Sequence, residues 1–265
     1  MSAFTTTVRS ILMKISSDPL LLKKNPANMV AFLQKQGKIG SQGTGNKVTD
    51  QEASFADVLT SHGFTFHPKG APSPTSGLYY LYQLQGSQRE GDFGLREYEY
   101  GKLKSEIIID LKHTNNKVFY LNDGWFQKNI VYVISWNAGT PKKPLYRTHI
   151  ALGQDIPSDE EKAHMETIIA VKKENNTSNN RVGSLYTYIR CANKYDCLGF
   201  TEVVAAAHLK TALSFVDTIS MKEEVPSSPP LAVSSAVAAA IQKPQKKQRV
   251  VVEQDTASEP AQSHE

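Results

Sequence analysis

Apolar residues recur every three or four positions at the start of the chain, a spacing that predicts an amphipathic helix. The residues with this spacing are Phe4, Val8, Ile11, Leu12 and Ile15. A second helix is predicted over residues 26–35, and a glycine-rich loop over residues 40–47 follows it. The chain therefore opens with helices.

A third helix is predicted to begin near Thr49. Glu52 lies three residues further on, which is the spacing of a capping box, and Phe55, Val58 and Leu59 supply a buried face. The helical N-terminal part thus extends over residues 1–65.

The middle of the chain changes to short aromatic and apolar stretches separated by turns that contain Gly, Asn and Lys. These stretches are residues 78–84, 92–100, 106–112, 118–121 and 130–136. Asn122-Asp-Gly124 is a turn between the last two. The pattern predicts five short strands, a meander over residues 78–136.

A further helix is predicted from Ser158, with Glu161 at capping-box spacing, to about Lys173. Three elements follow: an Asn-rich loop, a strand and a last helix, over residues 175–180, 184–190 and 201–219. Helices, then strands, then helix and strand again predict an α/β or α+β class.

These elements define one predicted domain, residues 1–221. The last aromatic residue is Phe215, and residues 222–265 hold five prolines, six serines and seven alanines, which predicts a disordered tail. The tail contains a basic cluster, Lys243–Arg249. This cluster fits a nuclear-import signal or a non-specific phosphate contact, and equally a solvated basic patch.

Composition narrows the class of protein. The chain has 265 residues, 40% of them hydrophobic, and no apolar run near the roughly 18 residues of a membrane span, so we expect a soluble protein without a membrane partner. Two cysteines and no signal-peptide pattern favour an intracellular protein, cytoplasmic or nuclear. The cysteines and histidines lack zinc-ligand spacing. Residues 1–221 carry 25 basic and 20 acidic groups, a balance compatible with a polyanionic partner.

The candidate chemistry lies in the stretch Ser105–His113. In a strand, Ile107, Ile109 and Leu111 share one face, and Glu106, Ile108, Asp110 and Lys112 share the other. Burying a carboxylate and an ammonium group costs several kcal/mol each unless a partner compensates them. A divalent cation and a phosphate would compensate both charges.

Asp92 lies 18 residues upstream, and an antiparallel return of the chain would place it beside Asp110. Two carboxylates, with water and a phosphate oxygen, are the hard ligands that Mg²⁺ prefers. Lys112 would then hold or deprotonate the attacking water and offset charge in the transition state. The alternative is an ordinary ion pair of Asp110 with Lys112 at a strand end, with Asp92 in an exposed turn.

Several of these segments together resemble PD-(D/E)xK nucleases, and type II restriction endonucleases most of all. The segments are Leu81-Tyr-Gln-Leu-Gln-Gly-Ser-Gln88, Gly91-Asp-Phe93, Ile107-Ile-Ile-Asp-Leu-Lys112, Asn122-Asp-Gly-Trp125 and Ile130-Val-Tyr-Val-Ile-Ser-Trp136. The resemblance covers roughly residues 45–155. It implies a restriction-endonuclease-like core, a mixed central sheet flanked by helices. One departure is Gly91, which stands where the family usually has proline.

The resemblance implies a role for each matching residue. Asp92 and Asp110 would be Mg²⁺ ligands, and Lys112 the catalytic lysine. Glu52 resembles a helix acid that often faces such a site, although a capping-box glutamate explains it equally well. Gln88 would sit at the scissile phosphate or only hold the turn.

Residues for DNA contact are less defined. Lys128, Lys142 and Lys143 flank the last strand of the meander and would follow phosphates. The residues Asn179, Asn180 and Arg181 carry side chains of the type that reads adenine and guanine edges. The alternative is that this polar loop is mobile and does not contact DNA.

The sequence therefore predicts a Mg²⁺-dependent, site-specific double-strand DNA endonuclease of restriction type that leaves 5′-phosphate ends. A palindromic target would imply a homodimer, and self-protection would imply a cognate DNA methyltransferase. The alternatives are a repair or structure-selective PD-(D/E)xK nuclease and a non-catalytic DNA-binding domain.

Overall fold

The computed structural model describes residues 2–23, 50–82, 91–114, 118–122, 125–140, 142–177, 190–194 and 201–219. All of them fall in one compact unit, Met1–Lys222. Several sequence-based predictions lie outside the described residues. They are the helix over 26–35, the loop over 40–47, the cap at Thr49, Gln88, Asn179, Asn180, Arg181, nearly all of the strand over 184–190, and the tail over 222–265 with its basic cluster.

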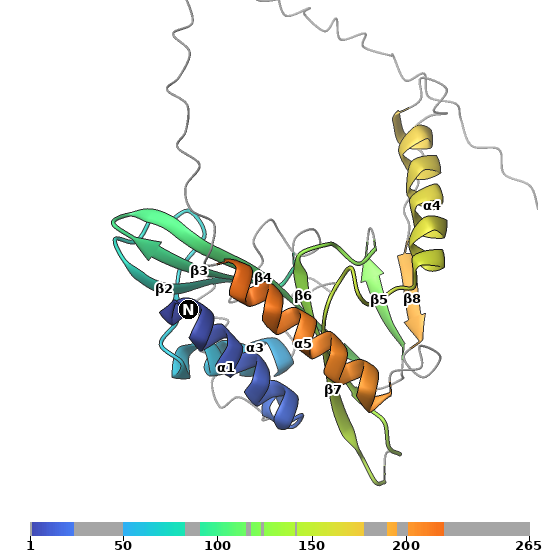
Figure 1. Cartoon of the computed structure of the whole chain (residues 1–265), viewed down its shortest axis with the longest axis horizontal. Helices are drawn as coiled ribbons and strands as arrows, with labels where there is room; N and C mark the ends of the chain where they lie inside the picture. The colour runs from blue at the N-terminus through green and yellow to red at the C-terminus, as the bar shows by residue number, and fades with distance from the viewer. Residues whose placement is uncertain are drawn as a thin grey trace, which may run out of the picture. The chain divides into compact units, whose positions relative to one another are not determined.

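A six-stranded mixed sheet forms the centre of the fold (Figure 1). In spatial order its strands are β1 (Thr65–Phe66), β2 (Gly77–Tyr82), β3 (Phe93–Glu99), β4 (Lys102–Thr114), β6 (Ile130–Asn137) and β7 (Tyr146–Leu152). The pairs β1–β2 and β4–β6 are parallel, and the other three pairs are antiparallel. The predicted mixed α/β sheet is confirmed.

The strand that follows β4 does not join this sheet. β5 (Val118–Asn122) pairs antiparallel with β8 (Arg190–Lys194) in a separate two-stranded sheet. β5 thus leads the chain out of the main sheet before β6 begins, so β6 returns parallel to β4. All five predicted strands of the meander exist, but they do not pair consecutively.

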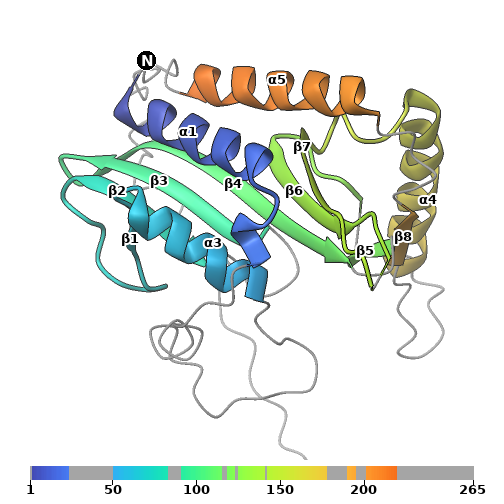
Figure 2. The ribbon, with the colours of Figure 1, turned by 90° about the horizontal axis from the view of Figure 1, so that it is seen from below.

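Three helices and one face of the sheet share the larger hydrophobic core. The helices are α1 (Ala3–Ser17), α3 (Asp50–Ser61) and α5 (Glu202–Ile219), with a 3₁₀ turn, η1 (Leu21–Lys23), after α1. The apolar stripe predicted for the first helix is confirmed, since all five of its residues are fully buried. Figure 2 shows α1 and α5 side by side along the sheet, where Arg9 pairs with Asp217 at 2.7 Å.

The opposite face of the sheet carries a smaller core. Its buried residues are Leu121, Phe126, Ile130, Tyr132, Ile134, Ala151 and Ile156. Ile108 packs against this cluster, whereas its neighbours Ile107 and Ile109 belong to the larger core. The alternation predicted for this strand is therefore confirmed, and both faces of β4 are covered.

Helix α4 (Asp159–Thr177) begins with the predicted capping box. The Ser158 backbone N–H donates to Glu161 Oε2 at 2.7 Å, and the Glu161 N–H donates to Ser158 Oγ at 3.2 Å. The predicted end near Lys173 is wrong, because residues 175–177 continue the helix and no Gly or Pro interrupts them.

Other boundaries also differ from the prediction. The strand expected over residues 184–190 is described only from Arg190, where β8 starts. β1 and β7 were not predicted. None of the described helices is long and apolar enough to cross a membrane.

Candidate active site

Asp92 is fixed to strand β4 by two backbone hydrogen bonds. Its own N–H donates to the Ile109 carbonyl oxygen at 3.0 Å, and its Oδ2 accepts from the Leu111 N–H at 2.8 Å. The β3–β4 pairing, with Phe93 opposite Ile109, brings the residue to this position. The antiparallel return expected from the sequence is therefore present, and Asp92 does not lie in an exposed turn.

The backbone conformation at residue 91 explains why this chain has glycine where the family that it resembles usually has proline. The φ of Gly91 is +83°, in the left-handed region that glycine tolerates, whereas a proline ring fixes φ near −65°. A Cβ at this position would stand 2.7 Å from Ile108 Cγ2 and 3.2 Å from the Ile109 carbonyl oxygen. This chain reaches Asp92 through a backbone conformation that proline cannot adopt.

Asp110 and Lys112 lie on the same face of β4. Lys112 Nζ donates to Asp110 Oδ1 at 2.6 Å, and Asp110 is only 8% exposed. The two residues do form the ion pair of the alternative interpretation. They form it next to Asp92 and largely away from solvent, where a charge needs compensation.

Asp92, Asp110 and Lys112 influence one another through their charges. Burial raises the pKa of Asp92 well above its usual value, and the neighbouring Asp110 carboxylate raises that pKa further. Burial lowers the pKa of Lys112, but the carboxylates of Asp110 and Asp92 outweigh it and leave the pKa above its usual value. Two buried carboxyl groups thus share a single ammonium group, and the ionised form of Asp92 is disfavoured.

Glu52 adds to this negative charge from the first turn of α3. Its carboxylate raises the pKa of both Asp92 and Lys112. Gln51, its neighbour, anchors the helix start by donating to Ser135 Oγ on β6 at 3.3 Å. The structure therefore places the predicted helix acid within electrostatic reach of the site, while its capping partner Thr49 lies outside the described residues.

This donor set fits Mg²⁺. Two neighbouring acidic side chains that share one ammonium group are suitable hard-oxygen ligands, and Mg²⁺ usually keeps several waters and binds substrate phosphate in addition. Within the described ranges no group of three or more His, Cys, Asp or Glu side chains is close enough to enclose a metal ion. Asp92 and Asp110 would therefore hold a metal as two protein ligands.

Tyr132 is a buried neighbour of the site that the sequence did not reveal. It lies opposite Asp110 in the β4–β6 register, and its hydroxyl accepts a hydrogen bond from the Gln127 N–H at 3.1 Å. Burial raises the pKa of Tyr132, and the charge of Asp110 raises it further. Its proximity to Asp110 follows only from the parallel pairing, which local periodicity does not encode.

The predicted DNA-contact lysines lie in the connections before and after β6. Lys128 is exposed in the turn before β6 and lines a cavity of about 460 Å³ together with Trp125, Lys162 and Glu166. Lys142 and Lys143 are exposed in the connection between β6 and β7. None of these side chains belongs to the Asp92–Asp110–Lys112 group.

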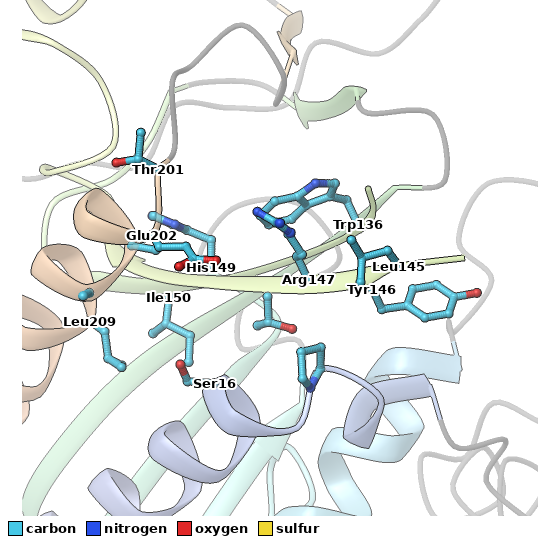
Figure 3. Close-up of a pocket in the computed structure, with 14 residues that line it drawn as sticks. Ser16, Trp136, Leu145, Tyr146, Arg147, His149, Ile150, Thr201, Glu202 and Leu209 are labelled. Atoms are coloured by element: carbon cyan, nitrogen blue, oxygen red, sulfur yellow. The ribbon is translucent and has the colours of Figure 1, made fainter. Parts of the chain in front are cut away.

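A second cavity, also about 460 Å³, lies between β7, the first turns of α5 and the end of α1 (Figure 3). Trp136, Arg147, His149 and Glu202 are among its lining residues. His149 Nε2 lies 3.0 Å from Nδ1 of His208, a pair that no sequence spacing predicted. This cavity does not include the acidic residues of the candidate active site.

Comparisons with protein-family models, with curated protein sequences and with solved structures find no match for this chain. The α/β class follows from the sheet and helices described above.

Proposed function

We propose that this chain is a Mg²⁺-dependent endonuclease of double-stranded DNA, built on a restriction-endonuclease-like core of the PD-(D/E)xK type. The observation that carries the proposal is the position of Asp92, whose carboxylate is hydrogen-bonded to β4 next to Asp110 and Lys112. A structural ion pair would need one carboxylate per ammonium group. The second buried carboxylate is costly to ionise, and a divalent cation would offset that cost.

Asp92 and Asp110 would hold the metal. Asp110 lies within β4, and Asp92, directly before β3, is held by the Leu111 N–H, so their oxygens are positioned in advance. Bound Mg²⁺ would supply Lewis-acid activation of the phosphate and of the attacking water. Glu52 would add negative charge near the metal and help orient the water.

Lys112 would act as a cation and not as a base in the absence of metal. Its pKa is raised, because the carboxylates of Asp110 and Asp92 outweigh its burial. A protonated ammonium group beside the scissile phosphate would donate to a non-bridging oxygen and offset the charge that develops there.

The reaction that fits these roles is hydrolysis of a phosphodiester bond. A water oxygen attacks phosphorus, the bond from phosphorus to the 3′ oxygen breaks, and the water loses one proton while the leaving oxygen gains one. The products are a 5′-phosphate and a 3′-hydroxyl. Gln88, placed by resemblance near the scissile phosphate, lies outside the described residues.

A site-specific enzyme of this kind would act as a homodimer on a palindromic target and would require a cognate DNA methyltransferase for self-protection. A repair or structure-selective nuclease would use the same three residues without reading bases. Incubation with unmethylated phage DNA and Mg²⁺ separates these options. Discrete fragments support the site-specific enzyme, and a smear supports the structure-selective one.

The non-catalytic DNA-binding domain is the outcome if neither appears. Asp110→Asn is the informative variant, and Glu106→Gln is its control. Glu106 lies on β4 like Asp110, but its carboxylate forms an ion pair with Arg96 at 2.6 Å. Cleavage that survives Asp110→Asn, or that EDTA does not stop, would contradict the proposal.

A further inference from the structure

The β6–β7 hairpin, residues 130–152, stands out by its charge. Residues 124–154 contain three lysines and Arg147 but no aspartate or glutamate. Lys142, Lys143 and Arg147 are exposed, and no ion pair joins them to any residue that the structure describes. With respect to the part of the chain that the structure describes, this hairpin therefore carries positive charge that no ion pair offsets.

The strand register relates Arg147 to the candidate active site. Lys112 lies opposite Ile134 on β6, which lies opposite His149 on β7. Arg147 is two residues from His149, so its side chain leaves the sheet from the same face as Lys112. Strand spacing and rise place the two Cα atoms about 12 Å apart, equal to three or four base-pair steps of DNA.

Trp136 is the cross-strand partner of Arg147. Figure 3 shows both side chains on one side of β7 and the side chain of Ile150 on the other. Neighbouring cross-strand side chains cover a common patch. Glu202, from the first turn of α5, is the only carboxylate among the described residues that line the adjoining cavity.

We propose that this face of the β6–β7 hairpin binds the DNA backbone, with Arg147 on a phosphate three to four base pairs from the scissile one. Lys142 and Lys143 extend the contact toward the tip of the hairpin. Arginine suits this position because its planar fork donates two parallel hydrogen bonds to a phosphate. The flat indole of Trp136 offers an apolar surface beside it. The inference rests on the proposed function, since it takes the scissile phosphate to lie at Lys112.

The test measures DNA binding without chemistry. A labelled duplex of mixed sequence is titrated with protein in EDTA over a series of salt concentrations. Arg147→Gln is expected to weaken binding about tenfold and to lower the slope of log K against log salt by about one, because one phosphate contact is lost. Arg147→Lys is expected to keep most of the slope, since the charge remains.

The matched control is Lys69→Gln, which removes an exposed cation that follows β1, at the opposite edge of the sheet. It is expected to leave both affinity and slope unchanged. An equal effect of Lys69→Gln and Arg147→Gln would overturn the inference, as would an unchanged slope in Arg147→Gln. Circular dichroism of each variant checks that the fold is retained.

Failure of the hairpin proposal and failure of the nuclease proposal give different results. If wild-type protein cuts DNA and Arg147→Gln keeps the wild-type salt slope of binding, only the proposal for the hairpin is contradicted. Protein that binds DNA through Arg147 but never cuts contradicts only the nuclease. If cutting occurs, Arg147→Gln is expected to raise KM about tenfold and to leave kcat within about twofold, because Arg147 is remote from the reacting atoms.

Discussion

The Asp92 carboxylate accepts a hydrogen bond from the Leu111 backbone N–H at 2.8 Å, and Leu111 lies between Asp110 and Lys112. The strand that carries two residues of the candidate site thus also holds the third. Because this bond uses the main chain, it does not depend on the side chain at position 111. The relative positions of the three groups are set by the β3–β4 pairing.

Asp92→Asn is expected to abolish cleavage and to stabilise the fold at neutral pH. Burial and the Asp110 charge raise the folded-state pKa of Asp92, so the folded protein favours its protonated form. That contribution to stability is complete below the unfolded pKa of 3.8 and is lost as the pH rises through the folded pKa. Above pH 3.8 the raised pKa of Asp92 therefore lowers the stability of the fold, and a neutral amide removes this effect.

Thermal unfolding at several pH values measures the effect. Asp92→Asn should have a higher Tm than wild type at neutral pH, and the difference should disappear in acid. Asp57→Asn, on the exposed side of α3, serves as the control with no such gain. A lower Tm for Asp92→Asn at neutral pH would show that the carboxylate is a net structural asset.

Mg²⁺ is expected to stabilise the wild-type protein. At a concentration ten times its dissociation constant, binding to the folded state alone adds about 1.4 kcal/mol to the free energy of unfolding. Asp92→Asn and Asp110→Asn should lose this gain, because each removes one of two protein ligands. Differential scanning fluorimetry over a series of Mg²⁺ concentrations measures this gain. A rise in Tm of Asp110→Asn equal to that of wild type would place the metal elsewhere.

Gly91→Ala is expected to destabilise the protein more than Gly70→Ala. Both glycines have φ of +83°, so both substitutions add the left-handed strain, about 1–2 kcal/mol. At Gly70 no atom lies within 4 Å of a new Cβ, whereas at Gly91 the Ile108 side chain is 2.7 Å away. We expect about 1–3 kcal/mol of additional loss from this overlap.

Chemical denaturation of the two variants provides the comparison. Gly91→Pro, which restores the residue of the resembling family, should be at least as disruptive, because its φ cannot be positive. Equal losses at positions 70 and 91 would mean that the strand around Ile108 moves without penalty.

Mild acid is expected to weaken the fold through His149. Burial and, to a smaller extent, the nearby His208 lower its pKa to about 3. Stability is complete above the unfolded pKa of 6.5 and falls with pH between 6.5 and the folded value, because only the unfolded chain binds the proton. From about pH 7.5 to about pH 5.5 the loss is about 1.4 kcal/mol for this group.

His149→Gln should reduce this pH dependence, and His164→Gln, on the exposed surface of α4, should not. Urea denaturation at the two pH values measures both. His208 also has a pKa lowered by burial and contributes in the same direction. A pH dependence that is unchanged in His149→Gln would assign the acid sensitivity to other groups.

The elements with strong local patterns could be predicted from the sequence. The stripe of the first helix, the alternation around Ile109 and the capping box at Ser158 each depend on residues a few positions apart. The approach of Asp92 to Asp110 was also predicted, because an antiparallel return of the chain is a short-range arrangement.

The remaining features depend on long-range pairing. β5 leaves the main sheet for β8, and the resulting parallel contact of β4 with β6 brings Tyr132 to Asp110. The contact of His149 with His208 joins an edge strand to a helix 59 residues away. The sequence shows Gly91 only as a departure from proline, because its positive φ is a property of the folded backbone.

The most direct test of the account is cleavage of unmethylated phage DNA by wild-type protein, Lys112→Ala and Lys104→Ala. Lys104 lies on the same strand and pairs with Glu99 at 2.7 Å, but it is exposed and far from Asp92 in the register. The account predicts Mg²⁺-dependent cutting by wild type and Lys104→Ala, and none by Lys112→Ala. Equal cutting by both variants, or no cutting by well-folded wild-type protein with Mg²⁺ or Mn²⁺, would contradict it.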